Sequence, residues 1–353
     1  MRQDLPHDRS VTIADVAERA GVSAMTVSKA LRDTGRISAD TRARVKRAAE
    51  DLGYVPNGLA GALSSRSTTL VGVLIPSVSD RVYAEVLSGI NATLRPQGFQ
   101  TFIGETFFNP DLESALLHTM LSLQPAGLIL SGGIRRTDRS LRLLARRTVP
   151  AVQLWDGDDP SLDATIGLSH HLAGRMAADH FVALGLHNCA YIGAELDRDL
   201  CASRRLDGFR SGLSAARLTE ITDPDLPRQV DTGDRLTARL LAENPTVQAI
   251  HYLNDAMALG GLRRLFAAGA RVPQDVSVIG FNGTSAATAV RTRLTTLAVP
   301  LHDIGQRAAA SILTLRHTGG TLPPDLITPQ LIAGNTTLPC QPANASLCAG
   351  GGA

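Results

Sequence analysis

The sequence has no long apolar run and no large excess of charge of either sign. No stretch approaches the roughly 18 consecutive apolar residues that a membrane-spanning helix needs. Residues 1–10, MRQDLPHDRS, are charged and lack the apolar core of a secretory signal. The formal net charge is only +2, so nucleic-acid binding would have to come from a local basic patch. We therefore expect a cytoplasmic protein.

Cysteines and recognisable catalytic motifs are also scarce. The four cysteines have no C-x-x-C spacing and no nearby pair of histidines, which favours reduced thiols over a zinc site or a disulfide framework. They are Cys189, Cys201, Cys340 and Cys348. The chain contains no P-loop, no G-x-S-x-G, no H-E-x-x-H, and no G-x-G-x-x-G after a strand pattern. We therefore expect no enzyme, no cofactor and no metal.

What the chain does have is a globular composition and considerable length. Its 353 residues exceed one ordinary core and suggest two or three packed units. Hydrophobic residues make up 44% and charged residues 19%, which is typical of folded chains. Residues 1–66 hold eleven lysines and arginines against eight aspartates and glutamates, so the positive charge concentrates in this N-terminal part.

Residues 11–56 predict three short helices. Apolar residues recur there at helical spacing, and Gly21 and Gly53 follow the first and third runs. Ser23 and Ser38 are suited to cap the second and third helices. A helix, a glycine-containing turn and a second capped helix match a helix-turn-helix, whose second helix enters the major groove of DNA. A small helical bundle without DNA-binding function has the same turns and caps and remains the alternative.

A helix-turn-helix would present the start of its second helix to base edges. Ala24 and Met25 offer apolar contact to a thymine methyl group, whereas Lys29, Arg32 and Arg36 suit phosphates or guanine edges. The predicted DNA-contacting residues of this segment are Thr12, Ser23, Ala24, Met25, Thr26, Ser28, Lys29, Arg32 and Arg36.

From Leu70 onward, short apolar runs alternate with amphipathic helical patterns. The runs are rich in Val, Ile and Leu and are followed by Gly, Ser, Asp or Asn; they lie at 70–76, 99–105, 126–133, 151–156, 189–194, 249–254 and 276–281. Apolar strands separated by helices predict doubly wound parallel sheets covered on both faces, and the span suffices for two. Ligands in such folds bind beyond the carboxyl ends of the strands. A two-lobed protein would place the ligand in the cleft between the lobes.

Several ordered motifs resemble the lac/galactose repressor family. They are V-T-I-A-D-V-A-E-R-A-G-V-S-x-x-T-V-S-K-A-L at 11–31, R-I-S-A-D-T-R-A-R-V at 36–45, L-G-Y-V-P-N-G-L-A at 52–60, G-V-L-I-P-S at 72–77, R-L-D-G-F at 205–209, N-D-A-M-A-L-G at 254–260 and V-P-Q-D-V-S-V-I-G-F at 272–281. The resemblance extends to about residue 338, and the pattern that begins V-L-I-P-S-V-S-D most resembles the gluconate-operon repressors.

The resemblance implies a domain plan. Residues 11–56 would form the DNA-binding headpiece, 57–67 a hinge helix, and 68–338 a periplasmic-binding-protein-like effector and dimerisation domain. Within it, the first lobe would comprise about 68–167 and 298–325, and the second about 168–297 and 326–338. The stretches 1–10 and 339–353 are expected to be disordered tails.

The resemblance also implies how DNA is bound. Family members are homodimers that read a pseudo-palindromic double-stranded operator, and their hinge helix wedges a leucine into the minor groove. Here Leu63 matches that position, with Asn57 and Ala60 beside it. Gly58 and Gly61 depart from a typical hinge. A plain flexible linker is the alternative for 57–67.

For the effector, the resemblance implies a cleft site for a small molecule. The matching positions are Ser77, Tyr83, Ser131, Asp156, Arg205, Asn254 and Asn282. Asn282 stands where many relatives that bind neutral sugars have aspartate, and the retained Arg205 can pair bidentately with a carboxylate. We therefore expect a repressor that a sugar acid, such as gluconate or a ketogluconate, releases from its operator.

Alternatives remain open at this point. Arg205 could instead pair with Asp207, Tyr83 could be core, and Asn282 could cap a turn. The same regulator could respond to a neutral sugar or a corepressor. A solute-binding protein is a more distant alternative.

Overall fold

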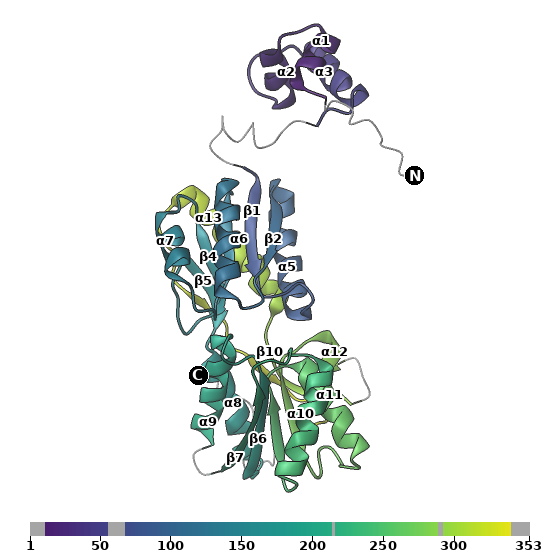
Figure 1. Ribbon diagram of the computed structural model, residues 1–353, viewed down its shortest axis with the longest axis vertical. Helices are drawn as coiled ribbons and strands as arrows, with labels where there is room; N and C mark the ends of the chain where they lie inside the picture. Colours follow the sequence, from purple (N-terminus) through teal and green to yellow (C-terminus); the bar gives the residue numbers. More distant parts are fainter. Residues whose placement is uncertain (1–10, 56–67, 214–215, 289–291, 340–353) are drawn as a thin grey trace, which may run out of the picture. The chain divides into compact units, whose positions relative to one another are not determined.

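The computed structural model describes residues 11–55, 68–213, 216–288 and 292–339, in two compact units, 1–68 and 69–353. Figure 1 shows the elements of both units. No helix within these ranges is both long and apolar enough to cross a membrane.

The first unit contains the three predicted helices. They are α1 (Ile13–Ala20), α2 (Ala24–Leu31) and α3 (Ala39–Asp51). Gly21 ends α1 in a left-handed conformation, φ 64°, which a residue without a side chain adopts freely. Ser23 Oγ accepts a hydrogen bond from the Thr26 amide at 3.2 Å and so caps α2. Val16, Val27 and Val45 are fully buried where the helices meet.

The first sheet of the second unit is parallel, with strand order β11-β5-β4-β3-β1-β2. Its strands are β1 (Leu70–Ile75), β2 (Gln100–Glu105), β3 (Gly127–Ser131), β4 (Ala151–Asp156), β5 (Ala164–Leu168) and β11 (Asp325–Leu326). Its helices are α5 (Arg81–Leu94), α6 (Pro110–Ser122), α7 (Asp138–Arg146) and α13 (Leu301–Thr318), and a 3-10 turn, η1, covers Arg95–Gln97. The core divides into two clusters, one containing side chains of α5 and α13 and the other side chains of α6 and α7, so the sheet is covered on both faces.

The second sheet has the order β12-β10-β9-β8-β6-β7. Its strands are β6 (Asn188–Ala194), β7 (Arg217–Asp223), β8 (Ala249–Tyr252), β9 (Ser277–Asn282), β10 (Thr295–Ala298) and β12 (Gln330–Ile332). The helices are α8 (His170–Ala183), α9 (Leu200–Gly212), α10 (Val230–Glu243), α11 (Asp255–Ala267) and α12 (Ser285–Thr288). Figure 1 shows α8 and α9 on one side of this sheet and α10 and α11 on the other. The predicted pair of doubly wound parallel sheets is confirmed, with β12 as an antiparallel edge strand that the sequence did not predict.

Glycines bring the main helix pairs into backbone contact. A Cβ added at Gly174 of α8 would lie 1.8 Å from the Arg205 carbonyl oxygen, and one at Gly208 of α9 would lie 1.9 Å from that of His171. Reciprocal glycines join α5 to α13 and α10 to α11 in the same way. The α8–α9 contact fixes the start of α8, which holds His170, against the middle of α9, which holds Arg205.

Candidate functional site

The outer face of α2 has the composition that the helix-turn-helix interpretation requires. Val27 and Ala30 are fully buried against the other two helices, which leaves the opposite side of α2 free. Ala24 and Lys29 are exposed there, and Met25 is 68% exposed although its side chain is apolar. An apolar side chain held this far out of a small core is available for contact with a partner.

Other predicted DNA-contacting residues also form local hydrogen bonds at the ends of their own helices. The backbone N–H and hydroxyl of Thr12 both donate to Asp15 Oδ2 at 2.7 Å, and the hydroxyls of Ser23 and Thr26 are 2.9 Å apart. Arg32 Nε donates to the Ser28 carbonyl oxygen at 3.1 Å, and its Nη2 donates to Ser28 Oγ. Arg36 is exposed beyond the end of α2. The predicted contacts Asn57, Ala60 and Leu63, the rest of the hinge and both predicted tails, apart from Pro339, lie outside the described residues.

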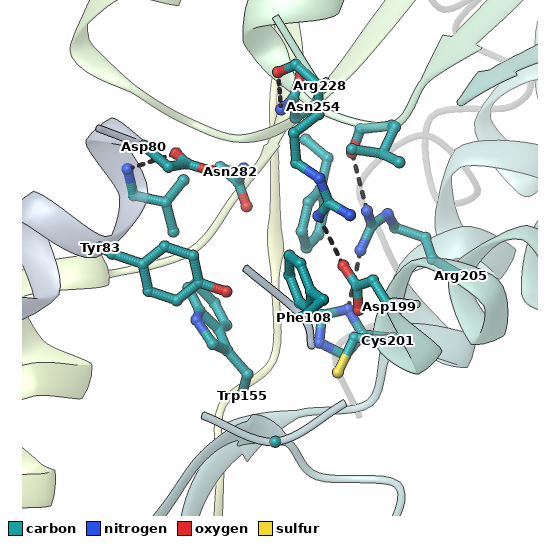
Figure 2. Close-up of a pocket in the computed structure, with 15 residues that line it drawn as sticks. Asp80, Tyr83, Phe108, Trp155, Asp199, Cys201, Arg205, Arg228, Asn254 and Asn282 are labelled. Carbon is teal, nitrogen blue, oxygen red and sulfur yellow. Dashed lines mark hydrogen bonds and ion pairs between the residues drawn. The ribbon is translucent and has the colours of Figure 1, made fainter. Parts of the chain in front are cut away.

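A cavity lies in the second unit where strands of both sheets end. Tyr83 and Asp80 reach it from the start of α5, Trp155 from β4, Arg205 from α9, and Asn282 from the end of β9. Figure 2 shows Tyr83 and Trp155 on one side of this cavity and Asp199, Arg205 and Arg228 on the other. Its inner part measures about 40 Å³, and an outer cleft of about 630 Å³ shares part of its wall.

Arg205 is a buried cation at the inner end of the cavity. Its side chain is only 3% exposed, and its guanidinium carbon lies 3.9 Å from the centre of the Phe281 ring. One Nη donates to the Leu253 carbonyl oxygen at 2.9 Å, and the other lies 3.0 Å from His170 Nδ1. Among the described residues no carboxylate forms an ion pair with Arg205, and its predicted alternative partner, Asp207, pairs with Arg210.

His170 is a neutral hydrogen-bonding group rather than a second cation. Burial, reinforced by the charge of Arg205, lowers the pKa of His170 to about 3. Arginine can only donate, so Nδ1 must be the accepting nitrogen and Nε2 carries the proton. That Nε2 is buried and has no hydrogen-bond partner within the described ranges.

Arg228 lies on the same side of the cavity as Arg205, and its charge is already neutralised by carboxylates. Its Nε donates to Glu195 at 2.9 Å and its Nη1 to Asp199 at 2.7 Å. Burial alone would raise the pKa of Asp199, but the charge and hydrogen bond of Arg228, together with the charge of Arg205, outweigh burial, so the pKa is lowered and Asp199 is ionised. The Arg228 guanidinium also lies over Phe108, 4.6 Å from the ring centre. This is a contact between the two lobes, because Phe108 lies between β2 and α6.

The structure separates the predicted effector residues into three groups. Tyr83, Arg205, Asn254 and Asn282 line the inner cavity, and Ser77 lines the outer cleft. The Asn254 amide also caps α11, accepting from the Met257 N–H at 2.9 Å, and donates to the Arg228 carbonyl oxygen at 3.1 Å. Asn282 is 8% exposed and has a left-handed φ of 110° at the end of β9.

Ser131 and Asp156 are not among the residues that line either space. The Ser131 hydroxyl is buried and donates to the Gly132 carbonyl oxygen at 3.3 Å. The Asp156 carboxylate pairs with Arg204 of the other lobe and accepts the Gly133 N–H at 3.2 Å. Asp156 lies next to the cavity, as expected, but its carboxylate contacts Arg204 and Gly133 and does not line the cavity.

Sequence reasoning missed several of the lining residues. Among them are Asp80, Trp155, His170, Asp199 and Arg228. The signal that could have found Trp155 is its place at the end of the predicted run 151–156, where ligands of these folds bind. His170 begins α8 just after β5, a strand that the predicted runs did not include.

Comparisons with known proteins agree with this architecture. Residues 12–57 match the family described as bacterial regulatory proteins, lacI family, and residues 178–337 match a periplasmic binding protein-like domain. The HTH-type transcriptional regulator GntR of Pseudomonas aeruginosa is 37% identical over 308 residues, which covers 86% of this chain and 89% of that protein.

Solved structures show the same similarity across nearly the whole chain. A LacI-family transcriptional regulator from Silicibacter pomeroyi superposes with a TM-score of 0.87 at 33% identity, covering 92% of this chain and 99% of that one. The lac repressor dimer bound to operator and the anti-inducer ONPF gives a TM-score of 0.78 at 27% identity, with 94% and 100% covered. The chain therefore belongs to the lac/galactose repressor family and is a DNA-binding transcriptional regulator that resembles the gluconate-operon regulators within it.

Proposed function

We propose that this regulator is a homodimeric repressor of a sugar-acid catabolic operon and that a sugar acid, such as gluconate or a ketogluconate, releases it from a pseudo-palindromic operator. The observation that carries the proposal is the buried Arg205 cation, which has no carboxylate partner in the described part of the chain.

A buried charge is costly unless an opposite charge accompanies it. Phe281 and the two neutral contacts of Arg205 compensate this charge only in part. A ligand carboxylate would complete the compensation, because a planar guanidinium pairs well with two carboxylate oxygens. A neutral sugar would leave the cation as it is.

The rest of the wall supports the same ligand class. The nearby Arg228 pairs with both Glu195 and Asp199, so these two carboxylates are engaged and neither forms an ion pair with Arg205. Asn282 contributes an uncharged amide where aspartate would repel an anion. Asp80 and Ser77, towards the outer cleft, are suited to accept and donate hydrogen bonds with the hydroxyl groups of the ligand.

Ligand binding would alter DNA affinity through the two lobes. The cavity takes residues from both sheets, so an effector in it favours one relative arrangement of the lobes. Coupling between two such sites is typically about 1–3 kcal/mol, or roughly 5–150-fold in affinity.

The test combines calorimetry with a mobility shift on the regulator's own promoter DNA. The full-length protein is titrated with gluconate, 2-ketogluconate and galactose, and each is then added to the protein–DNA complex. We expect the acids to bind and release DNA and galactose to do neither. Arg205→Met should abolish acid binding, whereas Arg210→Met, on the same helix in an exposed ion pair, should not. Tight binding of galactose, or stronger DNA retention with the acids, would overturn the proposal.

A further inference from the structure

Helix α7 of the first lobe exposes a row of arginines. Residues 135–147 contain six arginines and one aspartate, whereas residues 67–353 together hold 24 lysines and arginines against 25 aspartates and glutamates. Ser140 and Leu144 are buried and form the inner side of this helix, which Figure 1 shows at one side of the first lobe. The outer side carries three exposed arginines spaced three and four positions apart, which places them on one face: Arg139, Arg142 and Arg146. These three residues form the α7 stripe.

The charges of the α7 stripe are not compensated by the described part of the chain. Within those ranges no carboxylate forms an ion pair with the stripe or with the exposed Arg135 before it. The other two arginines of the segment are both paired, Arg136 with Glu113 and Arg147 with Asp163. Exposed arginines of α8, α10 and α13 each pair with a carboxylate one turn away. The stripe departs from the pattern of those helices.

The α7 stripe also works against the stability of its own helix. Like charges three and four positions apart on a helix repel each other. Arg139 lies in the first turn, where the positive end of the helix dipole disfavours a cation. Sequences that oppose such local rules without an internal compensation are expected at sites that serve a function. A partner of opposite charge would relieve both effects.

The length of the α7 stripe suits the phosphate backbone of DNA. Arg139 and Arg146 are seven positions apart in the helix, which is about 10 Å at about 1.5 Å per residue. A DNA duplex carries about one negative charge per 1.7 Å of its axis, so it offers about six phosphates over that length. Each arginine of the stripe therefore has a phosphate within its reach on a duplex laid along the helix.

The composition of this surface favours DNA over an acidic protein. Residues 135–147 contain no aromatic side chain. The exposed apolar residue Leu141 is two positions from Arg139 and so does not share its face. Protein interfaces centre on apolar and aromatic side chains, whereas contacts to the phosphate backbone depend on charge. DNA is also the partner that the family of this chain binds.

We propose that the α7 stripe is a second DNA-contacting surface, which binds phosphates of the same DNA molecule outside the operator while the headpiece holds the operator. Once the operator is bound, the DNA joined to it is present at a high effective concentration, so a few charge contacts that are weak on their own become effective. DNA bends over about its persistence length of 150 bp, so a longer fragment can return to the stripe. The inference concerns DNA alone and holds whichever effector the cavity takes.

The test measures how the operator affinity of the full-length protein depends on salt, without effector, on two duplexes. One is limited to the operator, and the other holds the same operator at the centre of a fragment of about 300 bp, or about two persistence lengths. Each phosphate contact adds about 0.9 to the slope of log affinity against log salt concentration. Three contacts should steepen the slope on the long fragment by about 2.7. Raising the salt from about 50 to 200 mM should then cost the long fragment about 40-fold more affinity than the short duplex.

The stripe variant replaces three arginines with glutamine: Arg139→Gln, Arg142→Gln and Arg146→Gln. It should bind the short duplex as the wild type does and lose the additional slope on the long fragment. Its melting temperature should not fall, because the substitutions remove repulsion. The matched control removes the same charge from exposed ion pairs elsewhere in the unit and should behave like the wild type on both duplexes; it carries Arg175→Gln, Arg210→Gln and Arg239→Gln.

Four results would overturn the proposal. Equal salt slopes for the wild type and the stripe variant on the long fragment would exclude the contact. Equal losses on both duplexes would place it within the operator. A loss in the control variant as large as in the stripe variant would make it an effect of net charge. Binding of fluorescent polyglutamate to the wild type but not to the stripe variant, with unchanged DNA slopes, would assign the face to an acidic protein.

Discussion

The ion pair between Arg204 and Asp156 makes a quantitative prediction about lobe closure. Arg204 lies on α9 of the second lobe and Asp156 at the end of β4 in the first, so their contact joins the lobes in the arrangement described. Nearby, the Leu200 N–H donates to the Gly133 carbonyl oxygen at 2.8 Å. Burial raises the pKa of Asp156, although Arg204 acts in the opposite direction, so removing Arg204 leaves a carboxyl that is costly to ionise.

The expected magnitude follows from the exposure of the two side chains. Breaking a fully buried pair costs about 3–5 kcal/mol, and an exposed pair is worth less than about 1 kcal/mol. The Asp156 side chain is 4% exposed and that of Arg204 is 28% exposed, so the pair lies between these two cases. We expect Arg204→Ala to destabilise the arrangement of the lobes in which this pair forms by about 2 kcal/mol. At about 1.4 kcal/mol per factor of ten, effector affinity should fall about 30-fold.

A double-mutant cycle measured by calorimetry distinguishes this role from ligand contact. If Asp156 serves to hold the lobes, Asp156→Asn should weaken the effector in the wild type and have little further effect in Arg204→Ala. Arg239→Ala, in an exposed ion pair on α10, is the matched control. Unchanged affinity in Arg204→Ala, or fully additive losses in the double variant, would refute the reasoning and restore Asp156 as a direct effector ligand.

Two further predictions concern the DNA-binding face and the effector domain. Met25→Ala should preserve the melting temperature of the headpiece, because the side chain is 68% exposed, and weaken operator binding by about 1–3 kcal/mol in a mobility shift; unaltered operator affinity would contradict a base contact. Burial raises the pKa of Asp255 from 3.8 to about 6, so the carboxyl's contribution to stability is fully present below about pH 4 and is lost as the pH rises through 6. The melting temperature of the wild type relative to Asp255→Asn should therefore fall between about pH 4 and 6 and change little above that, and a difference independent of pH would contradict this.

The sheets were predictable because their strands are buried on both faces. Such strands read as continuous apolar runs, and β1, β3, β4 and β8 all fall within the predicted ones. The antiparallel strand β12 has only three residues, from Gln330 to Ile332, which is too short for a periodic pattern. The hinge predictions stay predictions, since they fall outside the described residues.

The cavity was harder to predict because side-chain direction at a strand end depends on the backbone. Asp156 was expected to face the ligand, but its neighbour Trp155 takes a left-handed φ, and it is the indole that lines the cavity while the carboxylate turns to Arg204. Nothing in the local sequence signals this exchange. His170 gains its role only through Arg205, which is 35 positions away in sequence and 3.0 Å away in space.

The glycine contacts between α8 and α9 bear on how such a regulator could acquire new effectors. A methyl group at Gly174 or Gly208 would overlap a carbonyl oxygen of the other helix, so point mutations there are poorly placed to alter the spacing of the helices gradually. The part of the cavity wall formed by His170 and Arg205 is therefore held at a fixed spacing. Changes in effector preference are then left to the ends of the strands, where Asn254 and Asn282 lie, and to replacement of Arg205 itself.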